Sequence, residues 1–327
     1  MKKRGNSVLW IIALIAGAAI LLIFYRERFP FGKNNTAFAV EGKVKITKVL
    51  FYEGERKLML SKKGKEWLVD NKELAREEAV LALTSILRDI KVKSPVTSET
   101  FRHEIIEKKV QPVKVFVYEG RRPRKSFIVY HTDSNIHGNI MKLKPSSKPY
   151  IMYVPGFEND IGLYFTAGRH FWIPFTVFTL MPSEISAVKL ENIRDTASSF
   201  SISSGNGRYL LRTPGRGIIE AADSIKIRRY VSYFNYIPFE RWASELNEDE
   251  KRTIIASEPL YVITVVRSDG TPIRLTVWEK MLTADDGKKV ADIDRVWAVT
   301  DENQDIFVMR YFDLDPVLKK RTYFFKD

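Results

Sequence analysis

The sequence of 327 residues contains no cysteine and only four histidines. Without cysteine, no disulfide stabilises the fold and no lipid-modified cysteine anchors the chain. A zinc site built on thiolates is excluded as well. His131 and His137 are six residues apart in a loop-like segment, which is not the spacing of a zinc-binding helix. We therefore expect no metal site and no cofactor.

Catalytic motifs are also scarce. The chain has no G-x-S-x-G and no glycine-rich phosphate loop. Ser186 and Lys189 have the S-x-x-K spacing of some serine acylases, but they belong to an alternating strand pattern, and the companion S-D-N and K-T-G motifs are missing. The pairs Asp292/Asp294 and 313/315 could bind a cation or act as acid and base. Because these positions also suit turns, we expect no catalytic residue and no small-molecule substrate.

One enzymatic alternative stays open at this stage. A hydrolase would need a site that the motifs above do not reveal. Its side chains would come from the neighbourhood of Asp292 and Asp294 or of His131 and His137. A deep pocket that converges on either pair would favour this alternative.

Long apolar runs are limited to one, Val8–Tyr25, which follows the basic tip Met1–Arg4. Eighteen uncharged residues are about the length that crosses a bilayer core, and the charges just after the run argue against cleavage as a signal peptide. We expect an uncleaved signal anchor, with residues 1–33 as tip, transmembrane helix and linker. Since long domains translocate largely regardless of charge, the prediction is a single-pass inner-membrane protein with a cytoplasmic N-terminus and a periplasmic or extracytoplasmic body.

The positive charge is concentrated in the first half of the chain. The whole sequence carries +13, and residues 34–180 alone hold 25 basic and 16 acidic residues, a net +9. Residues 181–327 hold 22 basic and 23 acidic residues, a net −1. A basic surface favours anionic partners such as lipid, nucleic acid or an acidic polymer. We expect no nucleic acid partner, because aromatic residues do not interleave with the basic runs in the sequence.

Two basic turns are candidate contacts for an anionic partner. Each occupies the tip of a predicted hairpin, where side chains project into solvent. The alternative is that these charges only keep the strand ends soluble and unpaired. The candidate residues are Lys62, Lys63, Lys65, Arg121, Arg122, Arg124 and Lys125.

The pattern of elements indicates a duplicated body. In the first half, strand-like segments precede a helix with an apolar face at 75–90, and a hairpin and a last strand follow. The second half repeats this order, with a helix at 218–234, and Tyr261–Trp278 aligns with Val113–Tyr130 without a gap. We predict an α+β fold: a transmembrane helix, then two tandem repeats at 34–180 and 181–327, each an antiparallel sheet with a packed helix. Two aromatic-rich stretches, 164–178 and 230–242, are expected to pack one repeat on the other; the alternative is an exposed patch for a protein partner or the bilayer interface.

The order of elements also resembles that of an uncharacterised bacterial domain family, a domain of unknown function. The resemblance rests on Phe38–Val40 leading into Ile46–Val49, on Glu66–Val69 before the helix, and on Val113–Tyr118 and Tyr153–Phe157 after it. Members of that family are often membrane-anchored, and some are encoded beside gliding-motility-type ABC-transporter auxiliary components. The resemblance implies an envelope-facing protein without enzymatic activity.

These observations favour two functions. The first is a non-enzymatic, membrane-anchored scaffold or accessory subunit of a transport or surface-assembly system, with residues 8–25 in the membrane and an envelope protein as partner. The second is a binding module for an anionic lipid or polymer that uses the two basic turns.

Overall fold

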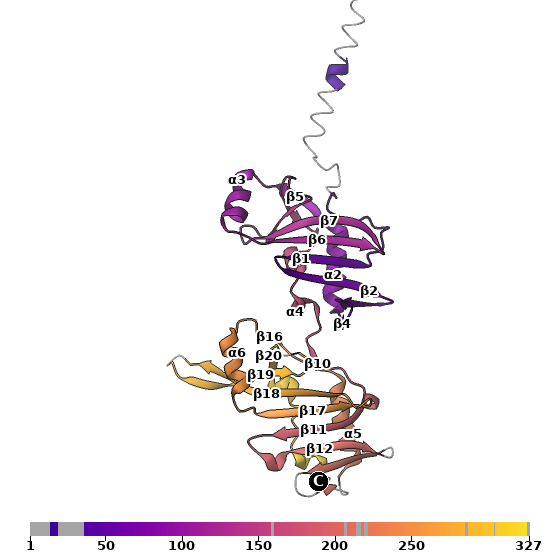
Figure 1. Ribbon diagram of the computed structural model, residues 1–327, viewed down its shortest axis with the longest axis vertical. Helices are drawn as coiled ribbons and strands as arrows, with labels where there is room; N and C mark the ends of the chain where they lie inside the picture. The colour runs from indigo at the N-terminus through magenta and orange to yellow at the C-terminus, as the bar shows by residue number, and fades with distance from the viewer. Residues whose placement is uncertain are drawn as a thin grey trace, which may run out of the picture. The chain divides into compact units, whose positions relative to one another are not determined.

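The computed structural model describes residues 14–18, 36–157, 160–205, 208–213, 217–218, 222–284, 287–303 and 305–325. The chain divides into two compact units, Met1–Pro174 and Phe175–Asp327. Each unit is built on a nine-stranded antiparallel sheet (Figure 1). The division falls a few residues before the predicted boundary at 180.

The first sheet has the strand order β4-β3-β2-β1-β6-β7-β8-β9-β5. Sequential hairpins build most of it, and β5 joins at the far edge by pairing with β9. Its strands are β1 Lys48–Glu53, β2 Arg56–Lys63, β3 Glu66–Val69, β4 Glu73–Leu74, β5 Lys91–Pro95, β6 Pro112–Glu119, β7 Arg122–His131, β8 Asn139–Lys142 and β9 Tyr150–Tyr153.

Helix α2, Glu77–Asp89, covers one face of this sheet and lies behind the strands in Figure 1. Acidic residues in its first turn and Arg88 in its last turn suit the helix dipole. Its buried side chains recur at helical spacing and face the inward positions of β1 and β6, such as Phe51 and Val115. Shorter helical segments complete the unit: α3 Ser98–Phe101, η1 Arg102–Glu107, η2 Ile161–Tyr164 and α4 Arg169–Trp172.

The second sheet has the order β14-β13-β12-β11-β17-β18-β19-β20-β16. Its strands are β11 Ile185–Asn192, β12 Phe200–Gly205, β13 Arg208–Thr213, β14 Gly217–Ile218, β16 Arg241–Trp242, β17 Tyr261–Arg267, β18 Pro272–Thr283, β19 Lys289–Thr300 and β20 Phe307–Arg310. The remaining elements are the pair β10 Thr176–Phe178 and β15 Ile237–Pro238, the helices α5 Ser224–Ser232, α6 Glu248–Ala256 and α7 Tyr311–Leu314, and the 3-10 turns η3 Pro182–Glu184, η4 Thr196–Ser198, η5 Tyr233–Asn235 and η6 Arg321–Phe324.

The two sheets have the same strand order, position by position. In each, the four strands before a helix, α2 or α5, form one end of the sheet, and a short strand after that helix, β5 or β16, lies at the opposite edge. This is the arrangement that a duplicated body would give. Most rings of the aromatic stretch at 230–242 pack inside the second unit, where Tyr230 is fully buried against Phe200 and Phe324, whereas Tyr236 is exposed.

The predicted α+β fold class is wrong, because the described chain is mostly β. Connections that showed no clear period in the sequence form further strands, notably β5, β8 and β16. In addition, the predicted second helix at 218–234 shortens to α5, since Asp223 caps its N-terminus through Ile225 and Lys226. The helices are therefore minor elements beside two large sheets.

The predicted transmembrane anchor is also corrected. In the part of the chain that the structure describes, no helix is long and apolar enough to cross a bilayer. Of Val8–Tyr25, only Leu14–Ala18 are described, and they are helical; the rest of the run lies outside the described residues. This finding contradicts the predicted signal anchor. It also contradicts the predicted single-pass inner-membrane localisation with an exported body.

Candidate functional site

The two basic turns lie at the same end of the first sheet, on either side of the start of β1. Thr47 connects them through its backbone and its hydroxyl. Its carbonyl accepts the N–H of Lys62 at 2.9 Å, and its Oγ1 accepts the N–H of Gly120 at 2.7 Å. Its own N–H donates to Tyr118 at 2.9 Å. One residue thus fixes the β2–β3 turn and the β6–β7 turn to the same point of the sheet.

Both turns are tight two-residue loops that push their side chains outward. Lys63 pairs with Glu66 around Gly64, and Glu119 pairs with Arg122 around Gly120. Both glycines have positive φ, at 63° and 56°, as primed hairpin turns require. The sequence therefore dictates both where the chain reverses and which cations stand at the tip.

Five of the seven predicted cations form one exposed group, which we call the basic end. Its members are Lys62, Lys63, Lys65, Arg121 and Arg122. Within the described ranges, none of the five forms an ion pair.

The other two predicted cations are already engaged elsewhere. Arg124 forms an ion pair with Glu119. Lys125 donates to the carbonyl of Ala37 at 3.0 Å, and burial lowers the pKa of its ammonium. The structure therefore brings five of the seven candidates together and removes two from the site.

Next to the basic end, the outward positions of β1, β2 and β6 form a surface that we call the lysine–aromatic face. Alternate residues of a strand point to the same side, and α2 covers the opposite side. The registers place Leu50 between Met59 and Phe116. The face consists of Lys48, Leu50, Tyr52, Lys57, Met59, Ser61, Lys114, Phe116 and Tyr118.

Lysines and rings alternate across this face. The Nζ of Lys48 lies 4.3 Å from the ring centre of Tyr118, and that of Lys57 lies 5.5 Å from the ring centre of Tyr52. Tyr52 and Phe116 meet edge to face at 5.7 Å. All three rings are partly exposed rather than buried. No acidic residue occupies any of the nine positions.

The second sheet has no such surface at the matching strands. The outward positions of β11 are Ala187, Lys189 and Glu191, and the positions opposite them are not aromatic. Lys189, for example, lies between Ser201 and Thr264. The two sheets thus have the same strand order, but the residues on their outward-facing surfaces differ.

The lysine–aromatic face was missed from the sequence, although a signal for it exists. In β1 and β6 the runs VLFY and VFVY keep large apolar residues at consecutive positions. Such runs are typical of strands with two apolar faces, whereas a half-exposed strand alternates. The register that sets the three strands side by side could not be derived from these runs.

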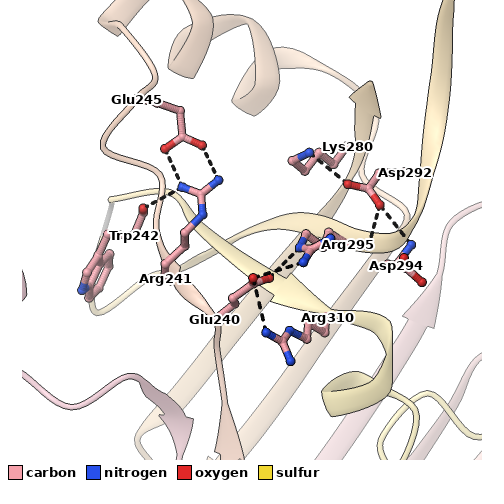
Figure 2. A network of polar contacts seen from close by, with 9 residues as sticks. All are labelled: Glu240, Arg241, Trp242, Glu245, Lys280, Asp292, Asp294, Arg295 and Arg310. Carbon is pink, nitrogen blue, oxygen red and sulfur yellow. Dashed lines mark hydrogen bonds and ion pairs between the residues drawn. The ribbon is translucent and has the colours of Figure 1, made fainter. Parts of the chain in front are cut away.

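Of the four carboxylates considered for catalysis, Asp292 and Asp315 form ion pairs in the second unit. Asp292 accepts Lys280 Nζ at 2.9 Å and the N–H groups of Asp294 and Arg295 at 3.0 and 3.1 Å (Figure 2). Burial favours the protonated form, but these hydrogen bonds outweigh it and lower the pKa of Asp292. Asp294 itself is exposed and contributes its backbone. Of the second pair, Asp313 has its pKa raised by burial, and Asp315 binds Lys319 at 2.7 Å.

Around Asp292, the charges drawn in Figure 2 balance. Glu240 binds Arg295 at 2.7 Å and Arg310 at 3.4 Å. Arg241 binds both carboxylate oxygens of Glu245, at 2.6 and 2.7 Å. With Lys280, Asp292 and Asp294 added, four cations face four anions. A charge-balanced network of this kind is suited to fixing β16, β18, β19 and β20 to one another.

This network holds a wide bulge in the hairpin of β18 and β19. Glu279 pairs with Val296 and Met281 with Ala291, so Lys280 alone faces 292–295. Beyond the bulge, Met281–Thr283 and Lys289–Ala291 pair only with each other among the described strands, and form an arm that projects from the sheet in Figure 1. The arm and its base expose large apolar side chains: Met281 45%, Leu282 44%, Val290 46%, Ile293 84% and Phe312 85%.

The two predicted histidines serve separate contacts in the first unit. His131 Nε2 lies 3.2 Å from the carbonyl of Phe165. His137 has a lowered pKa because of burial and the nearby charge of Lys93. Within the described ranges, no three His, Asp or Glu side chains are placed to hold a metal ion.

Ser186 of the S-x-x-K spacing lies in strand β11, as expected, and its hydroxyl donates to the carbonyls of Val266 and Arg267 in β17 at 3.1 and 2.9 Å. A depression of about 380 Å³ opens over β11, β12 and β13 beside Lys189 and Arg212. Neither the histidines nor Asp292 and Asp294 line it. Comparison of the chain with protein-family models, with curated proteins and with solved structures finds no match.

Proposed function

We propose that the chain is a non-enzymatic binding module for an anionic polymer, which it contacts through the basic end. The observation that carries the proposal is the convergence of two sequence-distant turns on Thr47. Five exposed cations gather there, and none has an ion-pair partner among the described residues. The net charge of +9 over residues 34–180 adds a long-range attraction for the same ligand.

The proposal favours a polymer over a small anion. The five side chains are exposed at two hairpin tips rather than buried in the fold. Single exposed cations contribute only about 1 kcal/mol each near a charged surface. Useful affinity therefore requires several charges to be contacted at once, as a repeating anion allows.

The test is the affinity of the purified chain for a fluorescent polyphosphate. Changing both Arg121→Gln and Arg122→Gln should weaken binding by about 2 kcal/mol, or roughly thirtyfold, at low salt. The matched control is Arg208→Gln with Arg212→Gln, which removes two exposed arginines from β13 of the second unit.

Two results would contradict this proposal. One is an equal loss of affinity in the β13 control, which would mean that only net charge matters. The other is an unchanged affinity in the variant of the β6–β7 turn. Unfolding curves of both variants should match the unaltered chain, because neither arginine pair has a described structural contact.

A second candidate function, a scaffold that docks a partner protein, is favoured by the arm of β18 and β19. Its strands leave backbone edges without a described partner, and its apolar side chains point to solvent. Exposed strand edges can accept a strand of another protein. The bulge held by Lys280 and Asp292 would then set the direction in which the arm projects.

A further inference from the structure

The lysine–aromatic face, defined above, adjoins the basic end and adds a second kind of chemistry to it. Ser61 and Tyr118, at its edge, are next to the β2–β3 and β6–β7 turns in the chain. A polymer bound at the basic end can therefore continue onto Tyr118, Phe116 and Tyr52. Polyphosphate could contact the lysines of this face, but it has no group that would stack on the rings.

Contrary to the expectation from the sequence, in which aromatic residues do not interleave with the basic runs, we infer that the anionic polymer is a single-stranded nucleic acid, whose phosphates contact the lysines while its unpaired bases stack on the three rings. This inference rests on the proposed function and names its ligand. Charge complementarity supports it, because three lysines and no acid lie on the face. Aromatic rings interleaved with cations are the general means of holding unpaired bases.

The spacing of the rings agrees with this ligand. Phe116 and Tyr118 are two residues apart on β6, hence about 6.8 Å apart along the strand. This is roughly twice the 3.4 Å rise of stacked nucleotides. Successive bases would therefore have to separate and use one ring each, as a single strand can do and a duplex cannot.

The face also indicates low sequence preference. Base edges are read by side chains that donate or accept in a fixed pattern. Among the nine positions, Ser61 and the tyrosine hydroxyls are the only uncharged polar groups. Stacking tolerates every base, since each has a flat face.

The experiment compares a 20-nucleotide oligo-dT, its duplex with oligo-dA, and polyphosphate of similar charge, each titrated against the full chain. Oligo-dT should bind at least about tenfold more tightly than the other two. Phe116→Leu keeps an apolar side chain but removes the ring, so it should weaken oligo-dT binding roughly five- to hundredfold and leave polyphosphate unaffected. Tyr236→Leu, an aromatic that is 62% exposed in the second unit, is the control.

Two further measurements do not depend on the folding of an aromatic variant. Photo-crosslinking of the unaltered chain to thio-substituted oligo-dT should label Tyr52, Phe116 or Tyr118. Lys114→Gln should reduce the slope of log affinity against log salt by about 0.7 for one lost phosphate contact. Crosslinks confined to the second unit would overturn the inference.

The outcomes separate the inference from the proposed function. If oligo-dT and polyphosphate bind equally and Phe116→Leu changes neither, the inference fails while the polymer-binding function stands. If no polyanion binds, both fail. Equal binding of duplex and single strand overturns the inference, as does tighter binding of a sulfated polysaccharide or of anionic vesicles that depends on the same rings.

Discussion

The ion pair of Lys280 and Asp292 is the most buried of the described charge pairs, with side chains only 11% and 4% exposed. Removing one member of such a pair leaves the other charged and desolvated, which costs about 3–5 kcal/mol. We expect Asp292→Ala to lower the free energy of unfolding in urea by this amount. Asp294→Ala, which removes an exposed carboxylate two residues away, should change it by less than about 0.5 kcal/mol.

A double variant distinguishes burial of charge from loss of packing. Lys280→Met combined with Asp292→Leu removes both charges and keeps apolar volume. It should recover most of the lost stability, because apolar replacement of a buried pair is often neutral or stabilising. Equal destabilisation by the single and double variants would show that the carboxylate is needed for its hydrogen bonds to the bulge backbone.

Glu240 gives the second unit a specific sensitivity to acid. Its hydrogen bond from Arg295, with help from Arg310, lowers its pKa from 4.5 to about 2. The folded state therefore gains stability from this carboxylate above about pH 4.5 and loses it as the pH falls toward 2. The contribution should be about 2 kcal/mol after allowing for solvent screening.

Glu240→Gln should make this contribution visible. At pH 7 the variant should unfold more easily than the unaltered chain, and the difference should shrink steadily between pH 4.5 and pH 2. The measurement is urea unfolding over that range. A difference that stays constant down to pH 2 would assign the effect to packing rather than to the charge.

The position of an individual residue could be predicted from the sequence where it depends only on neighbouring residues in the chain. The basic turns could be placed at hairpin tips because Gly64 and Gly120 mark the reversals. Arg124 and Lys125 could not be excluded, since their partners, Glu119 and the carbonyl of Ala37, are set by tertiary packing. Asp292 lies in an apparent strand pattern, and its lysine partner is twelve residues earlier across the hairpin.

At the scale of elements, the arm of β18 and β19 predicts a contact with another protein. A photo-crosslinking amino acid at Leu282, which is 44% exposed, should yield a discrete crosslinked species in the cells that make the chain. The same probe at Leu163, which is 57% exposed in the first unit, is the control. Adding Ile293→Asp should abolish the species, because a charge would then stand at the base of the arm.

Elements with a strong local period were predicted well. The expected helix at 75–90 matches α2 within two residues at its start, because its apolar positions all fall on one face. The short strands were not predicted, since β4, β14 and β16 have two residues each and exist only through their neighbours. The fold class was wrong for the same reason. Strand pairing is non-local, so a prediction that relies on segments with a clear hydrophobic period finds too few strands.

At the scale of the whole molecule, two sheets of identical strand order carry different open faces. Phe116 on β6 and Thr264 on β17 occupy matching positions of the two sheets, opposite Leu50 on β1 and Lys189 on β11. Their inward neighbours Val115 and Val265 are both buried and apolar. The core is thus similar in both units, whereas the outward positions differ.

The sequence could not show this difference of faces. Alternation indicates that a strand has two sides, but the identity of a surface depends on which strands are neighbours. β1 and β6 are separated by more than fifty residues that include α2. The candidate basic residues were therefore predictable one turn at a time, and their convergence was not.

The hydrogen bonds of Thr47 have a consequence for how affinity would depend on ligand length. Because one residue holds both basic turns, a chain bound at one turn is presented to the other at a high effective concentration. Short oligomers that reach a single turn would bind weakly and independently. Once a ligand is long enough to span both, the two contacts multiply, and binding would rise in a step rather than in proportion to length. Thr47 thus holds two ligand-contacting turns together, so that a single sheet can bind one polymer at two points.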